Sequence, residues 1–516
     1  MPNEAANSDG DSPNYISTGG KKWITCMILL LVNLLNYMDR YTIVGVMDHL
    51  KVHFDMTDSE TGMLQTVFIS SYMVFAPLFG YLGDRYNRKL LMITGICVWI
   101  SAVFMSSWCT QNHFILFLVC RGIVGIGEAS YSTLAPTIIS DLFHGGQRSR
   151  VLMLFYFAIP FGSGLGFIAG SRIALITGSW QWGVRFSPII GIMCLVLMIF
   201  LLEEPVRGAC EGARQNSDDG TIMDDIKYLS SIPTYYLGTI ASIASFFSIG
   251  AMTWWTPQFV GYGYALINNQ KIVPEDESAS IKTIFGVITC VAGIVGVAGG
   301  SMISRCWRDG TFIFKHHASE KADVYICAIS MFAALPFLFF AIFSAQYSDK
   351  ICLLLLYFAI MFMCLNWAVN VDVLMYVIVA NRRATAMAIQ TLITHLFGDA
   401  TSPYIIGLLS DWIRGDGNEG VTAHFFALQK SLYVPTFMLV IAGTFYLIAT
   451  FYVENDRKEA LFQMDAPDTF DRHNPEDMDE LLPSGEIPEE VEGVVEHPAT
   501  IVPTSATSTT NSDPSA

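Results

Sequence analysis

The sequence predicts an all-α membrane protein, with twelve transmembrane helices arranged as two six-helix bundles and both termini in the cytosol. Of its 516 residues, 52% are apolar and only 15% are charged, whereas about a quarter of the residues of a soluble domain are charged. Apolar runs close to the roughly 20 residues that cross a bilayer recur along most of the chain. Only a helix or a closed barrel satisfies its own backbone in lipid, and the runs lack the alternation of barrel strands. The expected class is therefore helical.

The apolar runs are bounded by glycine, proline and charged residues. They lie near residues 23–46, 60–82, 90–109, 113–139, 151–177, 184–202, 235–262, 282–304, 322–346, 350–380, 384–410 and 431–453. The widest polar break follows the sixth run and contains EEPVRG and RQNSDDG. The predicted parts are a disordered N-terminal segment, a first bundle, a cytosolic linker, a second bundle and an acidic disordered cytosolic tail, at residues 1–22, 23–202, 203–234, 235–453 and 454–516.

Charged residues at the run ends set the expected orientation. Eighteen lysines and arginines lie on the side of the two termini and seven on the other side, and these residues favour the cytosolic face of a membrane. Most of the net charge of −17 belongs to the tail, where residues 454–516 hold 16 acidic and 3 basic residues. Neither bundle has the basic surface that nucleic-acid binding requires, so no nucleic-acid partner is expected.

The cysteines and the N-terminus bear on cofactors and processing. Most of the eleven cysteines fall within or beside apolar runs, where cysteine behaves as a small hydrophobic residue. The sequence has no CxxC pair and no His/Cys cluster with metal-ligand spacing, so no metal site and no cofactor are predicted. The first 22 residues are polar and lack the apolar core of a signal peptide, so Trp23 is expected to open a retained helix.

Two neighbouring charges in the first run are the first candidates for a functional site. Asp39 and Arg40 follow each other in LLNYMDRYTIVG. Neighbours on a helix diverge by about 100°, so each side chain needs partners on other helices. The alternative is a pair at the helix end that extends to the membrane interface. A functional role is favoured, because charges inside apolar spans are costly.

The fourth run carries a second pair of charges, in RGIVGIGEAS. Arg121 and Glu128 are seven residues apart, about two helical turns, so both can line one cavity. Burial favours the neutral form of a carboxylic acid, and Glu128 has no basic residue three or four positions away, which favours proton uptake in an acidic compartment and release in the cytosol. For Arg121, a structural ion pair between helices is a nearly equal alternative.

The eleventh run contains a candidate proton-binding histidine. His395 and Asp399 are four residues apart in THLFGDATSP, so they share a helix face and can form a hydrogen bond. A histidine titrates between the pH values of an acidic organelle and the cytosol. A packing histidine with satisfied hydrogen bonds is an equally weighted alternative. Trp367 either belongs to the core or stacks on an amphipathic ligand.

The two halves echo one another. QRSRVLMLFYFAIPFGSGLGFIAG begins at Gln147 and NRRATAMAIQTLITHLFGDATSPYIIG begins at Asn381, and each places arginines before a glycine-bearing fifth helix of its half. Such repeats predict two related bundles with a binding site at their interface, near the middle of the membrane. The loop GDRYNRK, from Gly83, combines an acid with three cations between the second and third runs.

These motifs together resemble those of the major facilitator superfamily, and within it the Spinster family. The resemblance rests on the GDRxxRK loop, on RxxxGxGEA in the fourth run, and on NYMDRYTIVGV, LQTVFISSYMVFAPLFGYLGDRYNRK, RGIVGIGEASYSTLAPTIISDLF and HLFGDATSPYIIGLLSD. It implies a transporter and not an enzyme. By resemblance, the positions linked to proton coupling are Asp39, Glu128 and His395, and the conformational latch comprises Gly83, Asp84, Arg85 and Arg88.

The resemblance also implies a cargo and a set of binding residues. Spinster proteins are lysolipid carriers, and the lysosomal branch, which this sequence resembles more, exports lysophospholipids such as lysophosphatidylcholine and lysophosphatidylethanolamine to the cytosol with protons. The chain is expected to work as a monomer in the bilayer. Export of sphingosine 1-phosphate or another cargo, or a lipid sensor that does not transport, are the alternatives. The expected substrate-binding residues are Tyr37, Arg40, Arg121, Glu128, Tyr131 and Trp367.

The tail contains a candidate sorting signal. EDMDELLP fits the acidic dileucine form, with Asp477 followed after three residues by Leu481 and Leu482. On the cytosolic side, this motif predicts recognition by sorting adaptors and a location in the lysosomal or late endosomal membrane. The alternative is that the motif arose by chance in a solvated linker.

Overall fold

The structure is a computed structural model that describes residues 19–143, 145–205, 222–315, 317–379, 382–415 and 420–465. Within these ranges every regular element is a helix. The helices belong to one compact unit that ends at Met464. The candidate sorting signal at Asp477, Leu481 and Leu482 lies outside the described residues.

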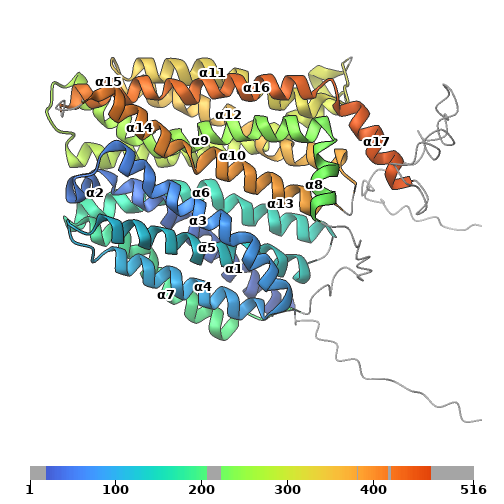
Figure 1. Ribbon diagram of the computed structural model, residues 1–516, viewed down its shortest axis with the longest axis horizontal. Helices are drawn as coiled ribbons and strands as arrows, with labels where there is room; N and C mark the ends of the chain where they lie inside the picture. Colours follow the sequence, from blue (N-terminus) through green and yellow to red (C-terminus); the bar gives the residue numbers. More distant parts are fainter. Residues whose placement is uncertain are drawn as a thin grey trace, which may run out of the picture. The chain divides into compact units, whose positions relative to one another are not determined.

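Two groups of helices make up this unit (Figure 1). The first group contains α1 (Gly19–Gly45), α2 (Met47–Phe54), α3 (Asp58–Arg85), α4 (Arg88–Ser106), α5 (Phe114–Leu142), α6 (Gly145–Thr177) and α7 (Trp180–Leu201). The second contains α9 (Pro233–Ile267), α10 (Glu275–Arg308), η1 (Phe312–Phe314), α11 (Ala322–Ser344), α12 (Asp349–Val377), α13 (Arg383–Thr394), η3 (His395–Asp399), α14 (Ser402–Arg414), α15 (Val421–Ser431) and α16 (Tyr433–Ala449). Two further helices are α8 (Ile222–Ser230) and α17 (Val453–Asp465).

The predicted pattern of spans is confirmed, with one irregular member. Eleven stretches of helix in the described residues are long and apolar enough to cross a membrane, with α15 and α16 counted together. The remaining predicted run, 384–410, consists of α13, η3 and α14. The middle segment, η3, is a turn of π-helix. This turn divides the run into shorter helices that continue one another.

The two halves meet along two helix pairs, α6 with α10 and α3 with α14. Glycine permits both crossings. A β-carbon on Gly164 would lie 2.5 Å from the carbonyl oxygen of Gly286, and the reverse distance is also 2.5 Å. On the other crossing, a β-carbon on Gly62 would lie 2.2 Å from the carbonyl oxygen of Pro403. Backbones this close leave no room for a side chain, so the interface between the halves depends on these glycines.

The turn between α2 and α3 positions several charged residues at the end of the unit opposite the termini, on the left of Figure 1. Asp55 closes α2 in the left-handed conformation, with φ of 51°. A capping box starts α3: the Thr57 hydroxyl accepts a hydrogen bond from the amide of Glu60, and the Glu60 carboxylate accepts one from the amide of Thr57. This box satisfies two amides at the helix start and fixes Asp58 as the first residue of α3.

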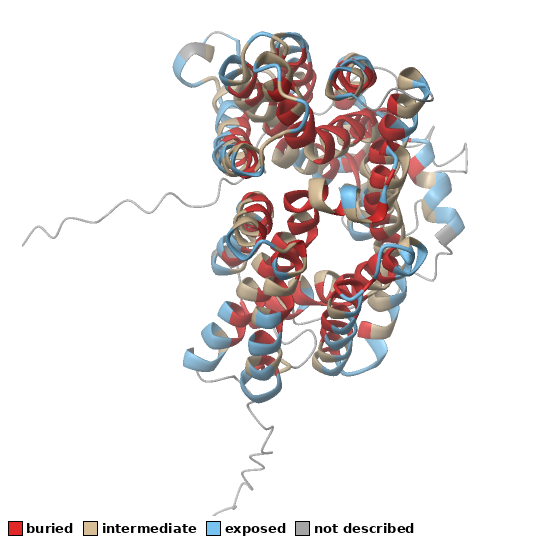
Figure 2. Ribbon diagram, turned by 90° about the vertical axis from the view of Figure 1, so that its left-hand side faces the viewer, coloured by how far each residue is buried: buried red, intermediate tan, exposed pale blue. Residues whose placement is uncertain are grey.

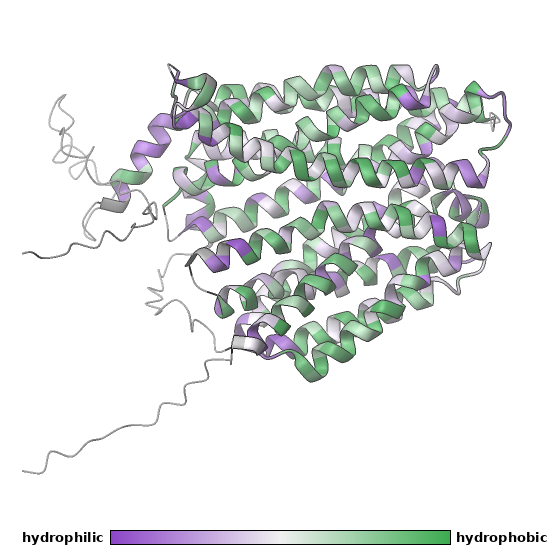
Figure 3. Ribbon diagram, turned by 180° about the vertical axis from the view of Figure 1, so that it is seen from behind, coloured by the Kyte–Doolittle hydropathy of each residue, from purple (hydrophilic) through white to green (hydrophobic). Residues whose placement is uncertain are grey.

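The outer surface of the helices is apolar. Buried residues line the inner faces of the helices and exposed residues their outer faces (Figure 2). Hydrophobic residues, in green, predominate along the spans, whereas α17 is mostly hydrophilic, in purple (Figure 3). Examples of exposed apolar side chains are Ile115, Ile176 and Phe200. A continuous apolar exterior of this kind requires lipid around it.

The parts at the ends of the predicted bundles differ from the sequence-based expectation. Helix α1 begins at Gly19, α8 lies in the predicted linker, and α17 covers the start of the predicted tail. Contacts with distant residues hold α17: the Asp456 carboxylate accepts a hydrogen bond from the amide of Thr234 at 2.8 Å. Composition alone does not reveal such partners, which is why a polar segment was expected to be disordered.

Candidate functional site

Asp39 and Arg40 are both buried, and each finds its partners on other helices, as predicted. Asp39 accepts hydrogen bonds from the indole nitrogen of Trp99 on α4, at 3.0 Å, and from the hydroxyl of Ser187 on α7. Arg40 forms an ion pair with Glu128 on α5, with 3.2 Å between Nη2 and Oε2. The exposed fraction is 2% for Asp39 and 8% for Arg40. The alternative of a pair extending to the membrane interface is therefore wrong.

Aromatic rings surround the Arg40 guanidinium. Its central carbon lies 5.0 Å from the ring centre of Tyr37, 4.9 Å from that of Phe68 and 5.1 Å from that of Tyr72. Ring faces attract cations in such geometry. The Asn36 amide adds two hydrogen bonds of 3.2 Å to the oxygens of Glu128 in the orientation that satisfies both groups. The charge on Arg40 is thus held by one carboxylate and three rings.

Arg121 lies close to this pair and has no ion-pair partner among the residues that the structure describes. Its side chain is buried, and its guanidinium carbon lies 4.8 Å from the ring centre of Phe68, the ring that Arg40 also contacts. Among the described residues its Nε and Nη2 have no hydrogen-bond partner, and none supplies a carboxylate to it within 4.0 Å. Within the described residues, Arg121 therefore does not form the structural ion pair that was the alternative prediction. A buried cation with free donors is suited to bind an anion.

A cavity of about 80 Å³ lies between the two halves. Its wall is mainly apolar, and Trp367 contributes to it as the sequence allowed. Tyr41, one helical turn after Tyr37, faces the same cavity from α1. The other polar residues of the wall are Ser163, Thr253, Thr256 and Thr289. Arg40, Arg121 and Glu128 do not line this cavity, and Tyr41, which directly follows Arg40 on α1, is the wall residue next to them in the chain.

His395 and Asp399 form the predicted hydrogen-bonded pair. His395 Nδ1 lies 3.0 Å from each carboxylate oxygen of Asp399. The two residues are the ends of the π-helical turn η3, and π-turns occur often at functional sites. The rings of His395 and Phe246 pack in a T-shaped arrangement with 4.9 Å between their centres, and the Phe246 ring is in turn 6.1 Å from that of Trp367. This chain of rings connects the pair to the wall of the central cavity.

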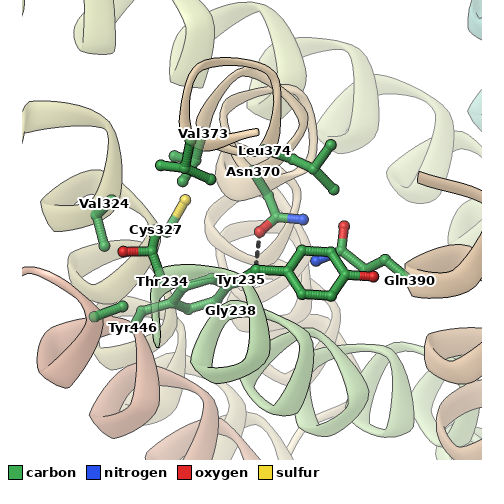
Figure 4. A pocket seen from close by; sticks show the side chains of 12 residues that line it. Thr234, Tyr235, Gly238, Val324, Cys327, Asn370, Val373, Leu374, Gln390 and Tyr446 are labelled. Carbon is green, nitrogen blue, oxygen red and sulfur yellow. Dashed lines mark hydrogen bonds between the residues drawn. The ribbon is translucent and has the colours of Figure 1, made fainter. Parts of the chain in front are cut away.

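A second, smaller pocket lies inside the second half (Figure 4). Its volume is about 10 Å³, which is room for about one water molecule. The hydroxyl of Tyr446 donates a hydrogen bond to the Asn370 side chain at its edge, at 3.2 Å, and the buried hydroxyl of Thr234 has no partner among the described residues. No sequence pattern predicts this pocket, which is too small for an organic ligand.

The predicted latch loop divides into exposed and buried parts. Asp84 and Arg85 are exposed, whereas Gly83 and Arg88 are buried. Arg88 bonds within the first half, at 2.7 Å to Asp141. A β-carbon on Gly83 would overlap the side chain of a leucine on α5, so this glycine brings α3 and α5 together. The loop's role as a latch stays a prediction.

Tyr131 lies away from the cavity wall. It is buried, and its hydroxyl donates a hydrogen bond to the carbonyl of Leu29 on α1. This contact fastens α5 to α1. Its expected part in substrate binding stays a prediction.

An interlock of charges that no sequence pattern predicts joins the halves at the end opposite the termini. Arg414 on α14 lies 3.5 Å from Asp58 and 2.8 Å from Asp411. Asp411 also accepts hydrogen bonds from the amides of Asp58 and Ser59, at 3.1 and 2.7 Å. Of these residues only Arg414 entered the count of basic residues at the run ends, because no local pattern pairs residues about 350 positions apart.

Lys51 on α2 adds to this interlock. Its ammonium contacts Asp58 and donates a hydrogen bond of 3.4 Å to the hydroxyl of Tyr262 on α9. Burial lowers the pKa of the Lys51 amine, but the interactions with Tyr262 and Asp58 outweigh burial and hold that pKa above its ordinary value. Lys51 therefore stays charged.

Comparisons with known proteins agree with the fold. Residues 29–315 match the profile of the Major Facilitator Superfamily. The chain is 41% identical to protein spinster homolog 1 of Rattus norvegicus over 86% of this chain and 83% of the relative. It is 40% identical to protein spinster homolog 3 of Danio rerio over 89% and 91%, and 43% identical to protein spinster of Drosophila melanogaster over 80% and 67%.

Solved structures match the arrangement of helices. One is a bacterial homolog of the human lysosomal transporter Spinster, in an inward-facing and occupied conformation, with a TM-score of 0.71, 17% identity, and coverage of 85% of this chain and 99% of that one. Another is a D-xylose-proton symporter, with a TM-score of 0.62, 19% identity, and coverage of 82% and 97%. At these identities the likeness concerns the fold.

Two bundles around a central cavity, together with these matches, define a multi-pass membrane transporter of the major facilitator superfamily. The identity to curated relatives over most of their length is more specific. The chain belongs to the Spinster family.

Proposed function

We propose that this transporter exports lysophospholipids, such as lysophosphatidylcholine and lysophosphatidylethanolamine, from the lysosomal lumen to the cytosol together with protons. The observation that carries the proposal is the buried cluster of Arg40, Glu128 and Arg121, together with an apolar cavity between the halves whose wall includes Tyr41, the residue after Arg40. Such a site suits a molecule with an anionic phosphate and a long acyl chain. The lysosomal or late endosomal location and the adaptor-binding motif in the tail belong to the same proposal.

Protonation of Glu128 provides the link between protons and cargo. A proton on its carboxylate removes the charge that balances Arg40, and a buried cation without a partner is costly. The freed guanidinium then binds a phosphate oxygen of the lysolipid, with Arg121 as a second donor. When Glu128 releases its proton towards the cytosol, it competes with the phosphate for Arg40 and favours release of the lipid. Asp39 and His395 are further proton-binding candidates.

The contacts between the halves support an inward-facing conformation. The interlock of Lys51, Asp58, Asp411 and Arg414 holds the halves together at the end that the distribution of lysine and arginine assigns to the lumen. At the other end, ion pairs such as that of Lys21 with Glu203 form within one half. The cavity of about 80 Å³ is smaller than the several hundred Å³ of typical ligand sites. Loading of a lysolipid therefore requires the halves to separate on the lumenal side.

A cargo comparison tests the proposed function. Purified protein is reconstituted into vesicles loaded with labelled lysophosphatidylcholine, sphingosine 1-phosphate or a sugar, with the interior acidic, and efflux is measured for each. The proposal predicts selective efflux of lysophosphatidylcholine. Selective efflux of sphingosine 1-phosphate or sugar identifies a different carrier, and the absence of efflux for every cargo favours a lipid sensor.

A further inference from the structure

A buried lysine of the second half contacts the first half at the lumenal end. Lys282 lies on α10 with an exposed fraction of 3%. Its ammonium donates hydrogen bonds of 2.7 Å to the carboxylate of Asp48 and of 3.0 Å to the carbonyl oxygen of Gly45. A buried ammonium needs such partners, because an unpaired charge in this position is costly.

The two partners of Lys282 mark the junction between α1 and α2. Gly45 is the last residue of α1, and Asp48 lies in the first turn of α2. The carbonyls at the end of a helix lack partners within the helix, and a cation stabilises them. Lys282 therefore caps α1 from the other half of the protein. Five residues before Gly45, the same helix carries Arg40.

Neighbouring groups strengthen this contact. The hydroxyl of Ser278, also on α10, donates a hydrogen bond of 2.5 Å to Asp48. Burial raises the pKa of the Asp48 carboxyl, but the ammonium of Lys282 and the hydrogen bonds from Lys282 and Ser278 outweigh burial and hold that pKa below its ordinary value. His49 lies beside Asp48, and its ring is 4.0 Å from Glu275 at the start of α10.

We propose that Lys282 is a positioning residue for transport: it clasps the α1–α2 junction when the lumenal side is closed, and its release lets the halves separate and α1 move with the Arg40 site. The inference rests on the proposed alternating access, and it concerns a site distinct from the charged cluster at Glu128. The lumenal side opens only when the two halves separate, so the contacts of Lys282 with Asp48 and Gly45 must then break. Its strength sets the balance between the two states.

Distance measurements between spin labels test the clasp. Labels on Val52→Cys and Ile272→Cys, two highly exposed positions in the two halves near the lumenal end, are introduced in a background whose accessible native cysteines are replaced by serine. The protein is studied in nanodiscs at neutral pH, without cargo. Lys282→Met is expected to raise the ratio of separated to closed distances about tenfold, which corresponds to about 1.4 kcal/mol.

Two further variants separate a clasp from a general packing defect. The Asp48 side chain is partly exposed. Asp48→Asn is expected to shift the distances in the same direction as Lys282→Met. The exchanged pair Lys282→Asp with Asp48→Lys is expected to restore the closed distances, at least in part. Asp276→Asn removes an exposed carboxylate in the first turn of α10 and is expected to leave the distances unchanged.

The outcomes are decisive in each direction. Unchanged distances in folded Lys282→Met, or a shift equal to that of Asp276→Asn, overturn the clasp. If Lys282→Met does not fold, the distances of Asp48→Asn decide alone. The measurement needs no cargo, so the clasp can stand if lysophospholipid efflux fails, and efflux can stand if the clasp fails.

Discussion

At the scale of single residues, the site depends on partners that no local pattern reveals. The adjacency of Asp39 and Arg40 was enough to predict that each needs another helix, because neighbouring side chains point in different directions. It did not identify those helices. Trp99 and Ser187 are separated from Asp39 by 60 and 148 residues, and tryptophan and serine occur throughout the apolar runs. The pairing of Arg40 with Glu128 was likewise invisible before the fold was known.

Trp99→Phe tests the support of Asp39. The substitution keeps an aromatic ring and removes the N–H that donates to the carboxylate. Leaving a buried acceptor without this donor is expected to destabilise the protein by about 1–3 kcal/mol, measured by thermal unfolding in detergent. Trp412→Phe, at a highly exposed position, is the matched control. Equal melting temperatures for the two variants contradict the assigned role of Trp99.

Arg121→Met tests whether Arg121 serves binding at the expense of stability. An apolar side chain of similar length removes a buried cation that has unsatisfied donors, and replacing buried charge by apolar groups is often neutral or stabilising. The expected result is a melting temperature equal to or above that of the wild type, with lysophosphatidylcholine efflux reduced about tenfold, or about 1.4 kcal/mol. A lower melting temperature with normal efflux contradicts this account.

At the scale of helices, long apolar runs were predictable and short or irregular elements were not. Burial in lipid forces any long apolar run into a helix, so the spans follow from composition and length. Helix α2 has only 8 residues, and its position depends on the contacts of Lys51 and Asp48 with the other half. The π-turn from His395 to Asp399 was missed for a similar reason. The spacing of four residues fits an α-helix equally well.

Gly164→Ala tests the crossing of α6 with α10. A methyl group at this position would lie 2.5 Å from the carbonyl oxygen of Gly286, so the helices must move apart. Crowding of a packed interface typically costs about 1–3 kcal/mol, and the expected result is a lower melting temperature with an increased population of lumen-open distances. Gly238→Ala is the control, because a β-carbon there meets nothing within 4 Å. Equal melting temperatures and equal label distances for the two variants contradict the requirement for glycine at this crossing.

At the scale of the whole molecule, two bundles were predictable from the sequence. Which end of the molecule is closed is evident only from the ion pairs between the bundles. The six-and-six division and the internal echo follow from the chain itself. Which end is closed depends on pairs such as Asp58 with Arg414, which are 356 residues apart and belong to different halves. Which residues form these pairs depends on how the two bundles pack against each other.

The clasp at Asp48 has a predictable dependence on pH. Its pKa is depressed in the closed state, so its contribution to closure is present above the ordinary aspartate pKa of about 3.9 and is lost as pH falls below that value. In Glu128→Gln without cargo, the distances between labels at Val52 and Ile272 are therefore expected to stay constant between about pH 7 and pH 5. A clear opening of this variant within that range contradicts the assignment of pH dependence to Glu128.

The central claim is that protonation of Glu128 links proton movement to lysolipid export. Its most direct test is the efflux of labelled lysophosphatidylcholine from vesicles of about pH 5 inside and about pH 7 outside, compared with vesicles without a gradient, for the wild type and Glu128→Gln. The account predicts that removing the gradient slows the wild type and leaves the residual efflux of Glu128→Gln unchanged. Efflux through Glu128→Gln that depends on the gradient as strongly as the wild type contradicts the claim.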